Sequence, residues 1–513
     1  MCIIALLQIF SAAACAREPS QGYGESEMLK RANEYIAAKK DAADGEFRGT
    51  YHFTPQIGWM NDPNGFVYFR GEYHIFYQYY PYDSVWGPMH WGHATSKDLV
   101  RWTHQPVALA PDEDYDEGGC WSGSAIAVGD MLYLFYTGHT ERDGVRVQTQ
   151  NIAYSRDGVH FVKYEGNPVV GPAQIPEGTP VADFRDPYVF ERDGKYFMLV
   201  GTLGDGVAKV QTYRSDDLFH WEYMSDILSR AHAGYCWECP SLVTADGENV
   251  FLCSPVDYPA EKYRFCNYNS CVYALGKFNP KTGKMQASAF DETDGGLDFY
   301  AAQATQDGKG AVMIAWMNMW NRTNVTHELG HGWAGSFTLP RRLHIKDGKL
   351  LQTPAEGIST YYTDEMTISD TLDGTASYEG VSGNILRLKI SADVSACRSF
   401  TISLFADDTH ETMLTYDAEE GTVLLDRSES GYPVTGDARE VSEGKRRIAQ
   451  YRPENGLLEM EIFLDKSSAE IFFGEGELVM TALVYPPEGA EDIRFSCEGS
   501  VRLSVVKNGI TVS

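Results

Sequence analysis

From about residue 50 onward, the hydrophobic and polar positions follow a strand pattern rather than a helical one. Between about residues 50 and 350, the apolar segments are short, rich in aromatic residues and bounded by Gly, Asp and Asn, which is typical of strands and turns. Before this region, Ser26 is expected to cap a short helix with Leu29, Ala32 and Ile36 on one face. After it, alternating stretches such as ILRLKI and LEMEIFL predict a second, antiparallel β region.

Two internal repeats organise the middle region. The stretches SKDLVRW, SRDGVHF and SDDLFHW begin at Ser96, Ser155 and Ser215, so that they recur about every 60 residues. Five apolar stretches follow a similar spacing, namely YHIFYQ, LYLFYTG, YFMLVGT, VFLCSP and VMIAW. An all-β repeat of four-strand size is typical of a β-propeller, in which blades pack around a central channel. The spacing predicts five blades.

The predicted fold class is therefore all-β, with a five-bladed β-propeller followed by a C-terminal β-sandwich. We expect a signal peptide at residues 1–16, an N-terminal extension with the short helix at 17–49, the propeller at 50–345 and the sandwich at 355–513. The stretch HIKDGKLLQTPAEG, which begins at His344, is interpreted as the linker between the two β regions.

The N-terminal residues have the features of a targeting segment. An apolar run is followed by small residues, and Ala14-Cys15-Ala16 resembles an A-x-A cleavage site. We predict cleavage after Ala16 and secretion; a lipoprotein-type segment cleaved at Cys15 is the alternative, and the protein would be cytoplasmic if the signal does not function. No later segment reaches transmembrane length, so no membrane association is expected.

Composition narrows the classes of partner. The formal net charge of −29 would repel a polyanion, which argues against nucleic acid and favours a neutral substrate. Aromatic residues make up 13 % of the chain and could form a core or stack on sugar rings. The eight cysteines beyond the signal are too few for a dense disulfide framework. Candidate bridges are Cys266–Cys271 and Cys397–Cys497, and the pair Cys236 and Cys239 lacks a second pair at zinc-site spacing.

A polar residue precedes each of the five apolar stretches. Because equivalent positions in successive blades lie at the same height around the channel, we expect these side chains to converge on one pocket. Carboxylates that gather in this way raise one another's pKa, which indicates a function rather than a structural role. The five residues are Asp62, Ser122, Asp186, Glu238 and Gln303.

Paired carboxylates in one pocket fit glycoside hydrolysis, which needs one ionised group and one group that holds a proton. Amide donors close to Asp62 in sequence are expected to keep it ionised. Glu238 follows Trp237, and apolar burial there is expected to raise its pKa into the range of a working acid. Asp186 follows Arg185, which is expected to favour the charged carboxylate and to suit a role in binding or charge stabilisation.

Three of these segments together resemble a known family. The blocks WMNDPNG, FRDP and WECP are similar to the three signature blocks of glycoside hydrolase family 32, the β-fructofuranosidases. Four further blocks resemble the same family in order along the chain, from about residue 50 onward: WSGSA, LDFYAAQ, WAGSFTLPRRL and SSAEIFFGEGELVMTALVYP. The resemblance implies a five-bladed propeller followed by a sandwich, in agreement with the repeats.

The resemblance also implies residue roles. Asp62 would be the nucleophile, Glu238 the general acid and base, and Asp186 a stabiliser of the transition state. Because the family retains configuration, the Asp62 and Glu238 carboxyl groups are expected to lie roughly 5–5.5 Å apart. No metal or organic cofactor is expected. The implied sugar-binding residues are Asn61, Gln78, Trp86, Ser122, Arg185 and Tyr300, with Trp121 and Trp320 at the rim.

Several functions share these residues. The resemblance implies fructose release from sucrose and short β-fructosides, with a small sugar as the only expected partner and a monomer or homodimer as the assembly. Sucrose-6-phosphate hydrolysis, exo-acting inulin or levan hydrolysis and fructosyl transfer are alternatives with the same catalytic groups. An inactive fructan-binding protein is the alternative from another class.

Overall fold

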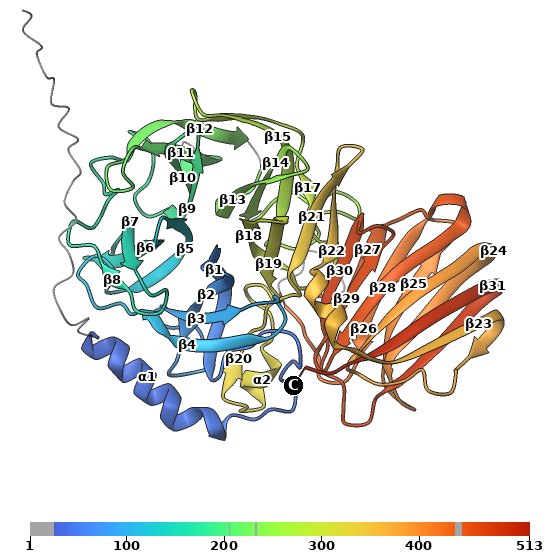
Figure 1. Ribbon diagram of the computed structural model, residues 1–513. Helices are drawn as coiled ribbons and strands as arrows, with labels where there is room; N and C mark the ends of the chain where they lie inside the picture. Colours follow the sequence, from blue (N-terminus) through green and yellow to red (C-terminus); the bar gives the residue numbers. More distant parts are fainter. Residues whose placement is uncertain (1–24, 205, 231–232, 437–443, 513) are drawn as a thin grey trace, which may run out of the picture.

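The structure, a computed structural model, describes residues 25–204, 206–230, 233–436 and 444–512. The predicted signal peptide lies outside these residues and stays a prediction. Two all-β parts lie side by side, a propeller and a C-terminal sheet that sits next to the fourth and fifth blades (Figure 1). None of the helices in the described part of the chain has the length and apolar character needed to cross a bilayer.

The N-terminal helix braces the first blade, as predicted. Helix α1 spans Glu27–Lys39, and the Ser26 hydroxyl caps it by accepting a hydrogen bond from the Leu29 amide at 3.2 Å. One face of the helix packs against the core of the first blade. The Asn33 side chain accepts a hydrogen bond from the Val107 amide in the outermost strand of that blade. A one-turn 3-10 helix, η1 (Lys40–Ala42), follows.

The middle region forms five antiparallel sheets of four main strands each, so the predicted five blades are confirmed. The blades are, in order, β1 (Gly58–Phe69), β2 (Glu72–Tyr80), β3 (His90–Ser96) and β4 (Trp102–Leu109); β5 (Gly119–Val128), β6 (Met131–Arg142), β7 (Val145–Ser155) and β8 (Val162–Lys163); β9 (Phe184–Arg192), β10 (Lys195–Gly204), β11 (Val207–Ser215) and β12 (Glu222–Arg230); β13 (Trp237–Ala245), β14 (Glu248–Pro255), β15 (Val272–Asn279) and β16 (Lys284–Ala287), with β17 (Asp291–Glu292) beside β15; β18 (Tyr300–Asp307), β19 (Gly310–Trp316), β21 (Arg341–Lys346) and β22 (Lys349–Pro354).

The innermost strands of the blades close a ring. Strand β1 contacts β5 and β18, and β9 and β13 complete the circle between them. A short strand after the one-turn helix α2 (Val325–Glu328), β20 (Trp333–Ala334), pairs in parallel with β1 and so ties the fifth blade to the first. Because the ring is closed, the side chains at equivalent heights on these strands face one common axis.

The Ser-x-Asp repeat forms the turn at the end of the third strand in each of the first three blades. In the first turn, the Ser96 hydroxyl accepts a hydrogen bond from the Leu99 amide at 2.9 Å, and Asp98 accepts one from the Val100 amide at 2.9 Å. Equivalent bonds occur in the turns that begin at Ser155 and Ser215. This repeat therefore has a structural explanation and does not contribute to the pocket.

The stretch interpreted as a linker is part of the propeller. Residues of HIKDGKLLQTPAEG form the hairpin of β21 and β22, which supplies the two outer strands of the fifth blade. The linker interpretation was wrong because about half of the residues in these outer strands are not buried. Their sequence is therefore largely polar and lacks the apolar run that marks a buried strand. The connection to the next part is the short 3-10 helix η2 (Glu356–Tyr361).

The C-terminal part is built on two long strands that take part in two layers. Strand β24 pairs with β28 along its first half and with β25 along its second half, while β31 pairs with it throughout. The large apolar core of this part lies between the layers, which gives the predicted sandwich-like arrangement. Its strands are β23 (Tyr362–Ala376), β24 (Leu386–Ala406), β25 (Glu411–Asp417), β26 (Thr422–Glu429), β27 (Arg446–Gln450), β28 (Leu457–Asp465), β29 (Ser468–Phe473), β30 (Leu478–Leu483) and β31 (Asp492–Ile510), with the 3-10 helix η3 (Glu454–Gly456) before β28.

The candidate disulfides do not form. The eight cysteines among the described residues all carry free thiols. The Cys397 thiol donates a hydrogen bond to the Val394 carbonyl, and the Cys497 thiol donates to the Leu372 carbonyl. Spacing in sequence could not reveal that these side chains already have backbone partners.

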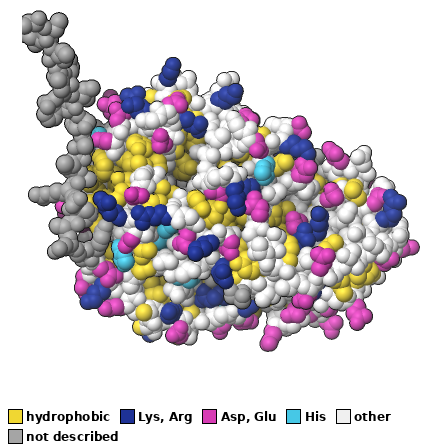
Figure 2. Space-filling model, in the orientation of Figure 1, with side chains coloured by type: hydrophobic (Ala, Val, Ile, Leu, Met, Phe, Trp, Pro, Cys, Tyr) yellow, Lys and Arg dark blue, Asp and Glu magenta, His cyan; other side chains and the backbone are white. Residues whose placement is uncertain are grey.

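Acidic side chains are scattered singly over the visible face of the molecule, interleaved with basic ones (Figure 2). On this face, the acidic residues therefore do not gather in one block. The net charge of −29 disfavours the approach of a polyanion.

A buried histidine joins the two parts of the molecule. His52 Nδ1 lies 3.0 Å from Asp465 Oδ2, and His52 Nε2 lies 2.9 Å from Glu470 Oε1, both in the C-terminal sheet. Asp465 also accepts hydrogen bonds from the backbone amides of Thr50 and Tyr51. Burial alone would lower the pKa of His52, but the two carboxylates outweigh it and raise that pKa to about 9.

We expect this histidine to make stability depend on pH. A folded-state pKa above the ordinary 6.5 means that the contribution, on the order of 3 kcal/mol, is complete below pH 6.5 and is lost as the pH rises through about 9. The midpoint temperature of unfolding should therefore fall between pH 6.5 and 9 in the wild type. His52→Gln should be less stable at pH 6 and should lack this part of the slope. Parallel slopes for the two proteins would contradict the prediction.

Candidate active site

Each innermost strand carries a β-bulge at the height where the polar residues were expected. In all five blades the register with the second strand shifts by one residue. Bulges re-aim side chains and are common beside active sites. Within the bulges, Asp186, Cys239 and Ala301 have positive φ angles of 64°, 48° and 52°, a conformation that costs energy in non-glycine residues. The bulges contain Asn61–Asp62, Ser122, Asp186–Pro187, Cys239–Pro240 and Ala301–Ala302.

Asp62 lies at the centre of the ring with hydrogen-bond donors on both oxygens. Its Oδ2 accepts a bond from the Ser122 hydroxyl at 2.7 Å, and its Oδ1 accepts one from the Asn61 amide at 3.0 Å. The sequence suggested that such donors would keep this group ionised. Burial is the larger effect, and Glu238 adds to it, so that the pKa of Asp62 rises to about 6.

Asp186 lies beside Asp62 and is also buried. Its Oδ2 accepts a hydrogen bond from the Cys239 amide at 2.9 Å, and its own amide donates to the Thr137 hydroxyl at 2.9 Å. Burial raises the pKa of Asp186 although the neighbouring Arg185 acts in the opposite direction. Arg185 favours the charged carboxylate, as expected, but burial has the larger effect on this pKa.

Glu238 is held by polar partners rather than by the apolar surroundings that the sequence suggested. Its Oε1 accepts hydrogen bonds from Arg185 Nη2 at 2.9 Å and Nε at 3.2 Å, and its Oε2 lies 2.5 Å from the Tyr300 hydroxyl. The Trp237 indole points elsewhere and donates to the Ala233 carbonyl in a separate core cluster. Successive side chains on a strand face opposite sides, so a neighbour in sequence does not share the same environment.

The tryptophans divide into two groups around the carboxylates. Trp320 stacks on Trp59 with ring centroids 6.3 Å apart, and the Trp59 indole donates to Asn61 at 2.8 Å, next to Asp62. Trp86 is 45 % exposed and meets Trp121 edge to face at 6.4 Å. A residue with that exposure is not propeller core, so Trp86 is available to a ligand.

The side chains of Gln303 and Gln78 form hydrogen bonds with backbone groups rather than with the three carboxylates. Gln303 accepts a bond from the Phe66 amide at 2.7 Å and donates to the Gly123 carbonyl at 2.9 Å, which links the first, second and fifth blades. The expectation that it would converge on the pocket was wrong, and Tyr300 represents the fifth blade there instead. The Gln78 amide donates to the Cys120 carbonyl at 3.0 Å.

Sequence reasoning missed other residues around the site. The Cys239 thiol lies 3.6 Å from Asp62 Oδ2 and 3.8 Å from Asp186 Oδ2. Asp183 accepts hydrogen bonds from Arg185 Nη1 at 3.0 Å and from the Tyr235 hydroxyl at 2.8 Å. The only available signal was position in the sequence, since Cys239 follows Glu238 directly and Asp183 lies two residues before Arg185, just ahead of strand β9.

This arrangement brings the carboxyl groups of three blades together around one point, each with its own hydrogen-bond donors. Buried carboxyl groups that lie close together raise one another's pKa, and the pKa values of Asp62 and Asp186 are both raised. Among the described residues, the side chains close enough together to hold a metal ion are Asp44, Glu46 and His331. That set includes none of the three carboxyl groups at the ring axis. Paired carboxyl groups that have their own hydrogen-bond donors are equipped for nucleophilic and acid–base chemistry.

Comparison with known proteins agrees with this chemistry. The family model described as the N-terminal domain of glycosyl hydrolases family 32 matches residues 52–354, and that of the C-terminal domain matches residues 353–511. A sucrose-6-phosphate hydrolase of Zymomonas mobilis is 36 % identical over 472 residues, covering 88 % of each chain. A family 32 β-fructofuranosidase of Bombyx mori is 34 % identical, with a TM-score of 0.81 over 94 % of this chain and 99 % of that chain. A mutant of the silkworm enzyme, solved in complex with sucrose, has the same identity and TM-score over 95 % of this chain and 100 % of its own.

Both parts of the molecule match their counterparts in one family, in the expected order and over nearly the whole described chain. The match to the first family model ends at residue 354, where the last strand of the fifth blade ends. With the carboxylates of three blades gathered on the ring axis, the fold, the site and the comparisons lead to the same conclusion: the chain belongs to glycosyl hydrolases family 32.

Proposed function

We propose that the protein releases fructose from sucrose and related short β-fructofuranosides by a double displacement that retains configuration. The observation that carries the proposal is the placement of Asp62 and Glu238 on opposite blades, each with its own set of hydrogen-bond donors. A retaining mechanism needs two carboxyl groups in different states, one as nucleophile and one as proton donor.

In the first step, Asp62 attacks the anomeric carbon of the fructosyl unit. The bond to the leaving oxygen breaks as Glu238 donates its proton to that oxygen, and the released sugar departs. In the second step, Glu238 removes a proton from water, and the water oxygen displaces Asp62 from the anomeric carbon. Asp186, on the blade between them in sequence, binds the fructosyl unit and stabilises the positive charge that develops on it.

The Tyr300 hydroxyl can form a hydrogen bond with Glu238 whether that carboxyl group is ionised or protonated. It lies 2.5 Å from Glu238 Oε2 and 3.1 Å from the Ser254 carbonyl. When Glu238 is ionised, Tyr300 donates to it; when Glu238 is protonated, it can donate to Tyr300, whose own proton then turns to Ser254. Burial, together with Glu238, raises the pKa of Tyr300 well above its ordinary value, so the hydroxyl keeps its proton. A general acid that becomes a base needs such a partner.

The remaining contacts suit a sugar of neutral charge. Arg185 already engages Glu238 and Asp183, so its guanidinium does not offer a phosphate the free pair of donors that such a group prefers. Trp86, whose exposed ring meets Trp121 edge to face, is proposed to contact the sugar together with Trp121 at the rim, and Asn61, Gln78 and Ser122 are proposed to bind sugar hydroxyls. A leader peptide cleaved after Ala16, if present, would place the protein where free sucrose is the available substrate.

Sucrose-6-phosphate hydrolysis is the second candidate, because the 36 % identical Zymomonas mobilis relative carries that name. Release of fructose from sucrose, sucrose 6-phosphate, inulin and levan, measured in parallel, separates the candidates. We expect kcat/KM to be highest for sucrose, at least tenfold above the phosphate. A preference for the phosphate or for a polymer would reject sucrose as the substrate.

Stereochemistry tests the mechanism independently. With methanol as a second acceptor, the product should be methyl β-fructofuranoside, identified by NMR. The α-anomer would contradict a double displacement, because a single displacement inverts the anomeric centre.

A further inference from the structure

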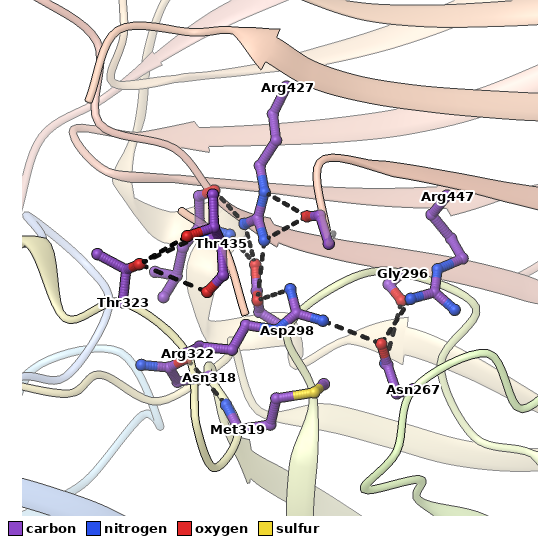
Figure 3. Close-up of polar contacts among 12 residues, drawn as sticks. Asn267, Gly296, Asp298, Asn318, Met319, Arg322, Thr323, Arg427, Thr435 and Arg447 are labelled. Atoms are coloured by element: carbon purple, nitrogen blue, oxygen red, sulfur yellow. Dashed lines mark hydrogen bonds and ion pairs between the residues drawn. The ribbon is translucent and has the colours of Figure 1, made fainter. Parts of the chain in front are cut away.

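A buried ion cluster joins the C-terminal part of the molecule to the propeller (Figure 3). Its centre is the carboxylate of Asp298, which is fully buried. Asp298 Oδ1 accepts a hydrogen bond from Arg322 Nη1 at 2.9 Å, and Arg427 Nη1 contacts Oδ2. Arg427 belongs to β26 in the C-terminal sheet, whereas Asp298 and Arg322 belong to the propeller. The cluster therefore lies across the boundary between the two parts.

Arg427 is held in a fixed geometry by its own partners. Its Nη1 donates to the Leu483 carbonyl at 2.7 Å, and its Nε and Nη2 donate to the Gly444 carbonyl at 3.1 and 2.8 Å. The planar guanidinium uses its donors in directions that a lysine ammonium could not reproduce. With only 2 % of its side chain exposed, Arg427 gives Asp298 a rigid and almost fully buried partner.

Asp298 ends a segment that is attached to the C-terminal sheet along its length. The amides of Gly295 and Leu297 donate to the carbonyls of Val479 and Thr481 in β30, at 2.8 and 2.7 Å. Two residues beyond Asp298, Tyr300 begins the innermost strand of the fifth blade and contacts Glu238. The C-terminal sheet thereby fixes the entry of the chain into the strand that carries the partner of Glu238.

Arg322 connects the same carboxylate to a second segment of the site. It lies two residues after Trp320, which stacks on Trp59, and Trp59 donates to the Asn61 side chain next to Asp62. The Thr323 amide adds another bond to the C-terminal sheet, donating to the Thr435 carbonyl at 3.1 Å. Arg427 therefore contacts a carboxylate, Asp298, that lies close in sequence or in space to two segments of the site. One of them carries Tyr300, the partner of Glu238, and the other carries Trp320, whose partner Trp59 bonds the neighbour of Asp62.

We propose that Arg427 is a positioning residue for catalysis and that it acts through Asp298. By orienting this carboxylate it fixes Tyr300 against Glu238 on one route and the Trp320–Trp59 pair against Asn61 on the other. The C-terminal sheet is then part of the catalytic apparatus, although it contributes no group that touches the substrate. The inference rests on the proposed roles of Asp62 and Glu238.

The test compares Arg427→Gln and Arg427→Lys with the wild type in the full chain, with sucrose as substrate. A displacement of about 1 Å in a catalytic group can cost about a hundredfold in rate, so we expect Arg427→Gln to lower kcat by roughly 10- to 100-fold. KM should change much less, and the pH profile of kcat/KM should shift, because the hydrogen bond from Tyr300 to Glu238 is altered. Arg427→Lys, which keeps a cation, should recover part of the loss.

A matched control removes a different buried contact between the same two parts. Asp465→Asn weakens the His52 cluster and should lower the unfolding temperature, while kcat and the pH profile stay those of the wild type. The proposal fails if folded Arg427→Gln has wild-type kcat and pH profile, or if Asp465→Asn reproduces its effects. If Arg427→Gln does not fold, the same readings on Arg427→Lys decide: a normal kcat and profile would overturn the proposal.

Kinetics of Glu238→Gln, measured in parallel, test the proposed role of Glu238 separately from the positioning role of Arg427. Full turnover in Glu238→Gln would reject the proposed acid–base role of Glu238, on which the inference rests. Loss of turnover in Glu238→Gln together with a normal Arg427→Gln would reject only the positioning role.

Discussion

Asp62→Asn is expected to lower kcat for sucrose by about 10⁴-fold or more and at the same time to raise the unfolding temperature. Without a carboxylate at this position, no covalent fructosyl intermediate can form, and a loss of 10⁴-fold corresponds to about 5 kcal/mol of transition-state stabilisation. The gain in stability follows from the sign of the pKa shift. Burial raises the pKa of Asp62 to about 6, so at pH 7 the folded state holds a carboxylate that the unfolded state ionises more easily.

The measurement combines steady-state kinetics, thermal unfolding and sucrose binding by calorimetry. Retained binding and a higher unfolding temperature would show that the loss of turnover is chemical rather than structural. Ser122→Ala is the matched control, because it removes one hydrogen bond to the same carboxylate and should cost much less in kcat. An Asp62→Asn protein with wild-type turnover would reject the nucleophile role of Asp62.

Glu238→Gln is expected to lower kcat for sucrose by roughly 10²- to 10⁴-fold, the usual contribution of general acid–base catalysis. Glutamine keeps a hydrogen-bond acceptor for Tyr300 but has no proton to give to the leaving oxygen. The loss should be much smaller for β-fructofuranosyl fluoride, whose fluoride leaves without protonation. Initial rates on the two substrates therefore identify the step in which Glu238 acts.

The comparison between substrates is the control within this experiment. An equal loss on sucrose and on the fluoride would mean that Glu238 has a different role, such as substrate binding. Tyr300→Phe provides a second comparison, since it leaves Glu238 in place but removes the hydroxyl 2.5 Å away. Its kcat should fall less than that of Glu238→Gln, and its pH profile should move.

Local patterns in the sequence were enough to predict the elements and the convergence of most of the polar residues on one site. The strand repeats predicted five blades because each blade has its own apolar second strand, with a pattern that is visible within a few residues. Ser26 predicted the start of α1 for a similar reason, since a helix cap acts over three residues. The hydrogen bond from Ser122 to Asp62 also follows from the repeat, because equivalent positions in a ring of blades converge.

The errors arose where a property depends on partners that are far apart in the chain. Glu238 was expected in apolar surroundings next to Trp237, yet its carboxylate pairs with the guanidinium of Arg185, 53 residues earlier in the chain. Gln303 occupies the repeat position but bonds the backbone of β1 and β5, because the bulge in β18 brings Tyr300 to the pocket instead. The residues of hairpin β21–β22 were interpreted as a linker, because the outer strands of a blade contain few consecutive apolar residues.

The sequence by itself determined the all-β class, the number of blades and the identity of the three carboxylates, because these depend on side-chain periodicity and short motifs. Tertiary structure alone decided which way each side chain points, which partner each carboxyl has and how far burial changes its pKa. It also decided that Arg427 of the C-terminal sheet reaches Asp298 behind the site. Bulges, burial and contacts between distant segments arise only when the ring closes, and no local pattern encodes them.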